Sequence, residues 1–495
     1  MAGRTHQSKR ASARLWIAGS VVLAAGALWL ALRRPAPVEA ASARPRNVLL
    51  LVVDTLRANR LSCYGYARPT SPNIDALARR GTLYRRNYSQ ACWTLPSMVS
   101  LMTGRSVVDE IKHLPAEAPV LGEALSSAGF ETAGFVANQG LGKDSGFERG
   151  FQTYVVDDNV DALELAAAFR QWHAARSERA RAGAERRPWF AWLQFIDPHE
   201  PYEPDPAHDL FHGPRLDQPR LEAALALARE EAEALSPAPP TPSFEKARVR
   251  AISDSNRYDG EVLCADEGVG RVLEELREAG ELEDTLVILC ADHGEMLYEH
   301  RQQPIFTQGA LKANGHLPAG VLDLLGHGHR PWYFDDLWNT PLVIAGPGFP
   351  AGAERTTLSA NLDLYPTVLE ALGLAPRAEL EGTSLWGGRE ADHERVFAHG
   401  HRVSAVVERG GLKLVLEPAA LYLAPADAPP RPTLFDRALD PGEELDLAAR
   451  EPVQSARLVR EIEAWKSRAQ RYDASRTGTK QIQVLKHLGY VDDER

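Results

Sequence analysis

The sequence predicts an α/β fold in which a doubly wound, mixed or parallel sheet carries helices on both faces and a small antiparallel β subdomain follows it. Three observations predict this: short apolar runs alternate with helical patterns, polar clusters follow several of those runs, and the pattern changes after about residue 394. A strand covered on both faces reads as a continuous apolar run. Alternation of such strands with helices is typical of doubly wound sheets.

The first apolar run is Asn47–Val53, which ends at Asp54. Four further runs have the same character: Thr132–Val136, Trp189–Ile196, Leu286–Cys290 and Leu342–Ala345. The helical patterns between them are Pro72–Arg80, Val120–Ala128, Ala162–Arg176 and Glu261–Ala279. Because strand and helix alternate, we expect these runs to lie side by side in one sheet.

Two segments interrupt this alternation. Residues 204–253 contain an acidic, alanine-rich helical stretch followed by a proline-rich loop, so we expect a cap or surface excursion outside the sheet. The segment Gln302–Leu325 is glycine-rich and irregular, and we expect it to lie in the active-site region.

Short strand-like runs dominate after Glu394. They are Val396–Ala398, Ser404–Val407, Leu412–Leu416 and Thr433–Phe435, and a helical pattern returns at Val453–Gln470. We therefore predict four parts: an N-terminal apolar segment and linker (1–46), a catalytic α/β domain (47–394), a small β subdomain (395–450), and a C-terminal helix and tail (451–495).

The N-terminal part contains the uncharged apolar run Leu15–Leu32. It is long enough to span a bilayer and short enough to be a signal-peptide core. Arg33 and Arg34 directly after it favour a retained anchor, whereas the small residues of Val38–Ala43 offer a cleavage site. Both alternatives place the remaining chain outside the cytoplasm, in the periplasm or cell envelope, and the first adds a membrane contact.

Charge and cysteine usage argue against nucleic-acid binding, a disulfide scaffold and a zinc knuckle. The net charge of -11 argues against nucleic acid as a partner, since phosphate backbones attract basic surfaces. The chain has four cysteines without metal-type spacing, so neither a disulfide scaffold nor a zinc knuckle is indicated.

The segment from Cys92 to Arg105 carries a candidate nucleophile. Thr94 stands two residues before Pro96, on a turn that leads into a helix. The free N–H groups of a helix N-terminus favour an anionic phosphate or sulfate. A hydroxyl in that position suits attack on an oxyanion ester, provided that other groups activate it.

Four polar clusters supply candidate partners for Thr94. They are Asp54, Asp197-Pro198-His199, Asp292-His293-Gly294-Glu295 and, before the last predicted strand of the sheet, His327-Gly328-His329. Strand ends at the carboxyl edge of a parallel sheet are where ligands bind. Carboxylates and imidazoles that meet there predict a site for a divalent metal ion.

These residues resemble the sulfatase family of the alkaline phosphatase superfamily. Its signature is a nucleophile followed, after one residue, by Pro and Ser and then by Thr-Gly-Arg, as in Thr94, Pro96-Ser97 and Thr103-Gly104-Arg105. Other segments that resemble the bacterial sulfatase-like branch are Val53–Arg57, Cys63–Tyr66, Asp197–Tyr202, Asp292–Glu295, Asp363–Thr367 and Leu434–Asp436. The resemblance runs from Asn47 to Val491 and implies an alkaline-phosphatase-like sheet.

The resemblance also implies roles for single residues. Asp54, Asp292 and His293 would hold one divalent cation, and the Thr94 hydroxyl would complete its shell. His199 and His329 would contact the oxyanion or protonate the leaving oxygen; His327 is an alternative to His329. Arg105 is expected to fix the loop, while for Asn138 a pocket role and a turn role are both open.

Three positions depart from the family pattern. Sulfatases carry Cys or Ser, matured to formylglycine, where this chain has Thr94, and an Arg where it has Met98. Cys92 lies two residues too early for that maturation, which indicates a formylglycine-independent enzyme and a packing role for Cys92. At the first strand end, Asp54-Thr55 replaces a paired Asp-Asp. A less anionic site favours Zn²⁺ or Mn²⁺ over Ca²⁺ or Mg²⁺, which stay alternatives.

The third departure is Asn59-Arg60, where the branch often has Asp and His, and the sequence suggests no role for it. As a whole, the sequence predicts a hydrolase of sulfate or phosphate esters that forms a covalent Thr94 ester. Two alternatives are a transferase of phospho-headgroups between lipid or glycan hydroxyls and a catalytically silent protein that binds anionic glycans. The substrate itself cannot be read from the sequence.

Overall fold

The computed structural model describes residues 44–469, apart from residues 109–110, 112, 159, 215, 236–243, 302–324, 330–332, 392, 401 and 418–428. Ala43–Arg495 group into one compact unit. The predicted membrane segment Leu15–Leu32, most of the interruption Gln302–Leu325 and the C-terminal tail lie outside the described residues. Among the residues that are described, no helix has the length and apolarity to cross a membrane.

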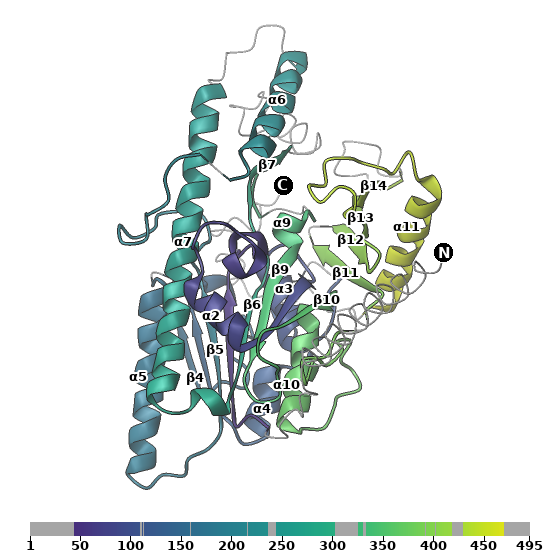
Figure 1. Cartoon of the computed structure of the whole chain (residues 1–495). Helices are drawn as coiled ribbons and strands as arrows, with labels where there is room; N and C mark the ends of the chain where they lie inside the picture. The colour runs from purple at the N-terminus through teal and green to yellow at the C-terminus, as the bar shows by residue number, and fades with distance from the viewer. Residues whose placement is uncertain are drawn as a thin grey trace, which may run out of the picture. The chain divides into compact units, whose positions relative to one another are not determined.

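An eight-stranded sheet forms the centre of this unit (Figure 1). Its order is β10 (Ala353–Ala360), β2 (Gly81–Tyr88), β9 (Asn339–Ala345), β6 (Thr285–Ala291), β1 (Asn47–Val53), β5 (Trp189–Phe195), β3 (Glu131–Val136) and β4 (Thr153–Val156). β1 pairs in parallel with β5 and β6, and Val53 lies opposite both Phe195 and Ala291. The three central strands therefore end level with one another.

The strand β9 runs antiparallel to both of its neighbours, β2 and β6. The other pairs in the sheet are parallel. The mixed α/β sheet predicted from the sequence is thus confirmed, and the apolar run Leu342–Ala345 is the strand that reverses direction. Its reversal brings the amino end of β9 to the edge where the parallel strands end.

The sequence did not predict β2, β4 and β10. β2 contains the half-exposed pair Arg85-Arg86, β4 is short and incompletely buried, and the first half of β10 is partly exposed. Since β4 and β10 are the edge strands, they are covered less fully than the central ones. A continuous apolar run identifies only strands that are buried on both faces.

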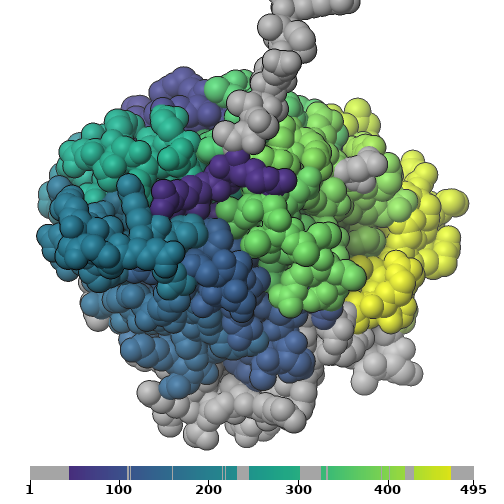
Figure 2. Space-filling view, turned by 90° about the horizontal axis from the view of Figure 1, so that it is seen from below, coloured from purple at the N-terminus to yellow at the C-terminus, as the bar shows by residue number. Residues whose placement is uncertain are grey.

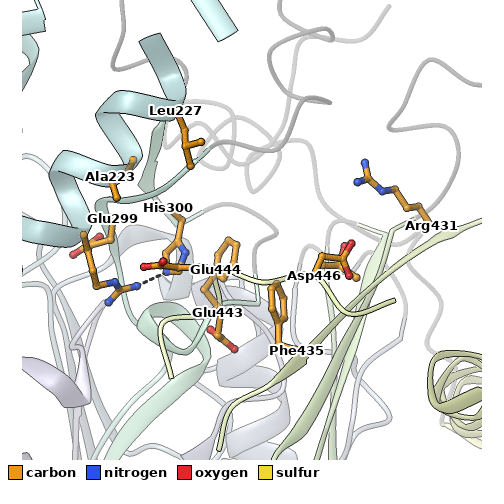
Figure 3. Close-up of a pocket in the computed structure, with 13 residues that line it drawn as sticks. Ala223, Leu227, Glu299, His300, Arg431, Phe435, Glu443, Glu444 and Asp446 are labelled. Atoms are coloured by element: carbon orange, nitrogen blue, oxygen red, sulfur yellow. Dashed lines mark hydrogen bonds between the residues drawn. The ribbon is translucent and has the colours of Figure 1, made fainter. Parts of the chain in front are cut away.

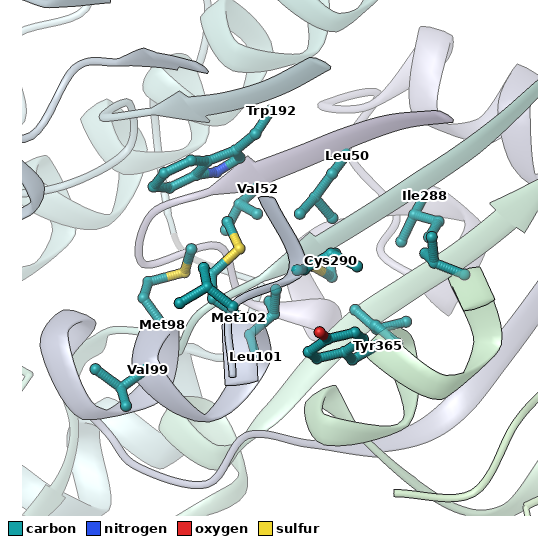
Figure 4. Packing of buried hydrophobic residues seen from close by; sticks show 14 of the residues in the cluster. Leu50, Val52, Met98, Val99, Leu101, Met102, Trp192, Ile288, Cys290 and Tyr365 are labelled. Atoms are coloured by element: carbon teal, nitrogen blue, oxygen red, sulfur yellow. The ribbon is translucent and has the colours of Figure 1, made fainter. Parts of the chain in front are cut away.

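Helices cover both faces of the sheet (Figure 1). Alternate residues of β1 divide between two cores, with Leu50 in one and Leu51 in the other. The Leu50 core includes residues of α3 (Thr94–Thr103), α4 (Leu121–Ser127) and α10 (Leu364–Leu372), and the Leu51 core includes residues of α2 (Pro72–Arg80), α5 (Ala162–Arg181) and α7 (Phe244–Glu278). Figure 4 shows Met98, Leu101 and Met102 of α3 packed near Val52 and Cys290.

The predicted excursion at 204–253 is a pair of helices. α6 (Gln218–Leu235) and the first half of α7 extend past the end of the sheet in Figure 1, and α7 continues without a break through the predicted helix. The base of α6 packs through Leu221 and Leu225 on the two-stranded sheet of β7 (Met296–Arg301) and β8 (Leu325–Gly328). The excursion is therefore attached beside the edge where the strands end.

The opposite edge of the sheet is seen in Figure 2. The first described residues, coloured purple there, cross this face between blue and green segments. The Arg46 amide donates to the Asp284 carbonyl oxygen (2.7 Å), and the Arg44 guanidinium donates to the Ala371 carbonyl oxygen (3.2 Å). These bonds fix the start of β1 in the middle of the sheet.

The C-terminal part contains the predicted antiparallel sheet. Its strands follow in order: β11 (Arg395–Gly400), β12 (Val403–Glu408), β13 (Leu412–Glu417) and β14 (Arg431–Asp436). The helix α11 (Pro452–Arg468) packs its Leu458 and Ile462 against one face of this sheet. The division of the chain into the four parts 1–46, 47–394, 395–450 and 451–495 stays a prediction.

A buried charge cluster joins this sheet to α9 (Asp335–Trp338), the turn of helix before β9. Lys413 of β13 is fully buried and pairs with Asp335 (Nζ–Oδ1 3.0 Å) and with Glu443, while Arg437 also pairs with Asp335. Buried charges are costly unless they are paired. The cluster therefore fixes how the small sheet lies on the catalytic sheet.

Replacing Lys413 with methionine should lower the free energy of unfolding by about 3 kcal/mol, because the buried Glu443 carboxylate loses its cation. Denaturant unfolding followed by circular dichroism measures this. The matched control is Lys466→Met, which breaks a partly exposed pair with Glu463 (3.6 Å) and should cost less than about 1 kcal/mol. Equal effects of the two substitutions would contradict a special role for the Lys413 cluster.

Candidate active site and metal centre

The predicted site residues meet at one edge of the sheet. Asp54 follows β1, the segment Asp197–His199 follows β5 and Asp292 follows β6, and these three strands end level. His327 and His329 precede β9, whose antiparallel direction places its amino end at the same edge. The structure thus brings together the four polar clusters that the sequence singled out.

Asp54, Asp292 and His293 form a buried triad with ligand atoms within 4.8 Å of one another. His293 Nε2 lies 3.7 Å from Asp54 Oδ1 and 3.6 Å from Asp292 Oδ2. Among the described residues these two carboxylate oxygens have no hydrogen-bond partner. Two buried carboxylate oxygens without partners, facing an imidazole nitrogen, fit a divalent metal ion.

Backbone and side-chain hydrogen bonds hold the triad in place. His293 Nδ1 lies 2.8 Å from the Gly294 carbonyl oxygen, which accepts a hydrogen bond from the Nδ1–H group. Nε2 is therefore the nitrogen that faces the carboxylates. Asp292 Oδ1 accepts from the amides of His293 (2.8 Å) and Thr55 (3.3 Å). These bonds orient the second oxygen of Asp292 toward the centre of the triad.

Asn138 serves both of the roles considered for it. Its Nδ2 donates to Asp54 Oδ2 (2.9 Å), and its Oδ1 accepts from the Gly140 amide (2.8 Å) in the turn after β3. The turn therefore positions an amide that orients the first carboxylate of the triad.

Burial shifts the pKa values of all three groups. It raises the pKa of Asp54, with the nearby Asp292 as the next cause, and it raises the pKa of Asp292 to about 7. It lowers the pKa of His293 to about 4, so this imidazole is neutral, as a metal ligand must be. A divalent cation between the two carboxylates would favour their charged forms.

Thr94 is the first residue of α3 and is almost fully buried. Its hydroxyl oxygen lies 3.3 Å from His293 Nε2 and 3.5 Å from Asp54 Oδ2. The preceding residue, Trp93, makes no side-chain cap, so the helix N-terminus presents its own amide groups beside Thr94. The structure therefore places the predicted nucleophile against the triad.

The rest of the signature segment fixes this placement. Ser97 donates its hydroxyl to the Asp292 carbonyl oxygen (2.6 Å) and so ties α3 to the loop that carries the triad. Gly104 ends the helix with a φ of +65°, and Arg105 Nε donates to the Glu379 carbonyl oxygen (2.9 Å). The hydrogen bond from Arg105 to Glu379 is the loop-fixing contact that the sequence led us to expect. Cys92 is buried in the hydrophobic cluster that also contains Trp338, as expected for a packing residue.

The structure separates the two candidate histidines before β9. The ring of His329 lies 4.8 Å from that of His293 and 4.7 Å from that of His199. His327 instead stacks on Tyr298 at 4.5 Å. His199 and His329 therefore lie together beside the triad, whereas His327 packs against β7.

Several charged residues near the triad were missed or left without a role. Arg57 donates to the Glu295 carbonyl oxygen (3.2 Å) and pairs with Glu299 (2.7 Å), which links the loops after β1 and β6. Arg60 pairs with Asp259 (3.1 Å), and Asn59 donates to Asp336 (2.7 Å). The departure Asn59-Arg60 is thus part of a hydrogen-bonded charge network that connects the loop after β1 to α7 and α9.

A separate cavity of about 240 Å³ lies between α6, β7 and the C-terminal sheet (Figure 3). Figure 3 shows Leu227, His300 and Phe435 around it. Arg220 also lines the cavity, and its Nη2 lies 2.8 Å from His300 Nε2. None of the predicted catalytic or metal-binding residues lines this cavity. It is therefore distinct from the site at Thr94.

Fold and site together define a class of α/β hydrolases that act on sulfate and phosphate esters. The model of the sulfatase family matches residues 46–374, and the chain belongs to this family. It is similar to the choline-sulfatase of Rhizobium meliloti (strain 1021), with 22% identity over 66% of this chain and 68% of that protein. It is also similar to human N-sulphoglucosamine sulphohydrolase, with 28% identity over 66% of this chain and 61% of the human protein.

Solved structures share the fold. The phosphonate monoester hydrolase of Agrobacterium radiobacter superposes with a TM-score of 0.62 at 23% identity, over 86% of this chain and 96% of that one. A protein solved with its substrate D-glucosamine-2-N,6-O-disulfate gives a TM-score of 0.63 at 18% identity, over 86% and 98% of the two chains. At these identities the likeness concerns the fold, which agrees with the alkaline-phosphatase-like sheet expected from the sequence.

Proposed function

We propose that this chain is a metal-dependent hydrolase of sulfate or phosphate esters that uses Thr94 as its nucleophile. The observation that carries the proposal is the position of the Thr94 hydroxyl, 3.3 Å from His293 Nε2 and 3.5 Å from Asp54 Oδ2 of the buried triad. A threonine hydroxyl is a weak nucleophile until a neighbouring base or metal activates it.

The chain's own residues account for the proton movements. As Thr94 Oγ forms a bond to the sulfur or phosphorus, its proton passes to Asp54 Oδ2, and the bond to the leaving alcohol breaks. The leaving oxygen takes a proton from the His199–His329 pair. Water then attacks the sulfur or phosphorus of the Thr94 ester and gives one proton to the histidine pair. The bond to Thr94 Oγ breaks, sulfate or phosphate is released, and Thr94 Oγ takes back the proton held by Asp54.

Asp54, Asp292, His293 and the Thr94 hydroxyl would hold the cation. When bound, it would favour the alkoxide of Thr94 and neutralise charge on a non-bridging ester oxygen. With Thr55 in place of a second carboxylate after β1, the ligands are two carboxylates, one imidazole and one hydroxyl. This set favours Zn²⁺ or Mn²⁺ over Ca²⁺ or Mg²⁺.

A substrate screen tests the proposal directly. Aryl sulfate, phosphate monoester, phosphodiester and phosphonate substrates are assayed with Zn²⁺, Mn²⁺, Ca²⁺ and Mg²⁺ added singly. Hydrolysis of at least one ester, dependent on the metal, is expected, and product analysis with an added lipid or glycan acceptor separates hydrolysis from transfer. Hydrolysis of an ester at a rate that depends on none of the four metals would contradict the proposal.

Cys92→Ala should leave kcat/KM within about threefold of the wild-type value, because Cys92 is a buried packing residue and not the nucleophile. Burial also raises the pKa of its thiol, which keeps it in the unreactive form. Enzyme assays and the intact mass of the peptide that contains Cys92 measure this. Inactivity of the variant, together with a wild-type mass that departs from cysteine, would instead indicate formylglycine.

The proposed location of the catalytic unit is outside the cytoplasm, with Leu15–Leu32 as its membrane anchor. Fractionation of cells that produce the full chain tests this. Recovery in the membrane fraction, with protease access from the outer side, is expected; recovery among cytoplasmic proteins would contradict it.

A further inference from the structure

His329 has a carboxyl partner that no motif assigned a function. Its Nδ1 lies 3.3 Å from Glu295 Oε2, although the two residues are 34 positions apart and belong to the loops after β6 and before β9. The ring of His329 also lies among other imidazoles, with its centroid 4.8 Å from that of His293 and 4.7 Å from that of His199. One nitrogen of His329 is therefore engaged by Glu295.

The residue Glu295 is buried, and hydrogen bonds fix its backbone. It is fully buried, and its backbone oxygen accepts from the Arg57 guanidinium (3.2 Å). The preceding amide, that of Gly294, donates to the Leu337 carbonyl oxygen (2.7 Å). Within the described part of the chain, His329 is the hydrogen-bond partner of the Glu295 carboxyl, and Oε1 has none. A buried carboxyl with so few partners is costly, which argues for a purpose beyond folding.

We infer that Glu295 is a positioning residue for the leaving-group chemistry: it holds Nδ1 of His329 and thereby directs Nε2 toward the leaving oxygen of the ester that Thr94 attacks. The inference rests on the proposed hydrolysis. The hydrogen bond between Glu295 Oε2 and His329 Nδ1 contains one proton, which either atom can carry. Because the bond exists in both cases, the orientation of the His329 ring does not depend on the charge of Glu295. Hydrogen bonds of this kind fix ring orientation in other histidine sites.

In this arrangement His329 supplies the proton that the leaving alcohol needs. The Nε2–H proton of His329 passes to the leaving oxygen as its bond to sulfur or phosphorus breaks and the Thr94 ester forms. The alcohol departs neutral, and the imidazole keeps its hydrogen bond to Glu295. The benefit is largest when the leaving alcohol is a poor leaving group, because an alkyl alkoxide needs the proton and a 4-nitrophenolate does not.

A second histidine–glutamate pair in the same region provides the matched control. His327 Nδ1 lies 3.7 Å from Glu200 Oε2, beyond hydrogen-bond distance, and Glu200 is 45% exposed. His327 stacks on Tyr298 and takes no part in the proposed reaction. Glu200→Gln therefore removes a carboxylate close by without touching the Glu295–His329 bond.

The test compares two esters of the same anion, one with a 4-nitrophenyl and one with an alkyl leaving group. Glu295→Ala should lower kcat/KM for the alkyl ester by about 100-fold and for the 4-nitrophenyl ester by less than about fivefold. Glu295→Gln keeps an acceptor oxygen and should recover part of the alkyl activity. His329→Ala should show the same selectivity, and adding Glu295→Ala to it should cause little further loss. Glu200→Gln should change neither ester.

An equal loss on both esters in the Glu295 variants would overturn the inference, since a general structural defect does not distinguish leaving groups. A readout independent of turnover is the ¹⁵N spectrum of the histidine side chains in the metal-loaded protein. Glu295→Gln should shift the nitrogens of the signal that His329→Ala removes, and Glu200→Gln should not. If that signal is unmoved, Glu295 does not hold His329. If it moves while no ester is hydrolysed, the proposed function fails and the pairing stands.

Discussion

Thr94→Ala is expected to lower kcat by about 10³-fold or more while leaving the protein folded. The substitution removes the attacking oxygen, and the remaining groups cannot form the covalent ester. Alanine is a good helix former and fits the first position of α3. Steady-state kinetics measure the loss, and thermal unfolding followed by circular dichroism should give a melting temperature close to that of the wild type.

The matched variant is Thr94→Ser, which keeps the hydroxyl and should keep much of the activity. Rapid quenching of the wild-type enzyme with substrate, followed by peptide mass analysis, should find sulfate or phosphate on the peptide that contains Thr94. Wild-type rates in Thr94→Ala would refute the assignment of the nucleophile, whatever the metal content.

Removal of the metal is expected to abolish turnover, because the buried carboxylates of Asp54 and Asp292 then lack the cation that would organise them around Thr94. Dialysis against a chelator should remove the activity, and one of the four divalent ions should restore it. Metal analysis of the purified wild type should give about one ion per chain.

Asp292→Ala should lower both the bound metal and the activity, since it removes one of the two carboxylates that would hold the cation. His327→Ala is the matched control and should leave the metal content unchanged, because its ring stacks on Tyr298 away from the triad. Stoichiometric binding should also raise the melting temperature of the wild type, and not that of Asp292→Ala. Full activity in metal-free protein would contradict the proposed chemistry.

Much of the fold could be predicted because its central strands are buried on both faces. β1, β3, β5 and β6 have the continuous apolar runs that this environment requires, and they appear where expected. The direction of β9 could not be predicted, because an apolar run reads the same for either direction. The continuity of α7 was also missed, since its first half extends beyond the core and its apolar stripe changes there.

A metal site at this edge could be predicted because polar clusters follow the apolar runs, whereas the choice of Asp54, Asp292 and His293 came from the resemblance to the sulfatase family. The candidate nucleophile could be predicted from the turn that leads into α3. The choice between His327 and His329 could not. Residues two apart in a regular strand point to the same side. Gly328 has a φ of +77° at the end of β8, and this turn of the backbone separates the two side chains. The pairing of Glu295 with His329 was equally hidden, since it joins two loops.

The reversed strand β9 has a consequence for how this enzyme could change its substrate. The chain leaves the sheet at the end of β6 and re-enters it at the start of β9, and both points lie on the catalytic edge. The intervening connection carries Glu295, His327 and His329, so it begins and ends beside the reacting ester. A connection to a parallel strand would have to return across a whole face of the sheet. This one can be lengthened or shortened between Glu295 and His327, and β1 and α3, which carry Asp54 and Thr94 at their ends, need not move.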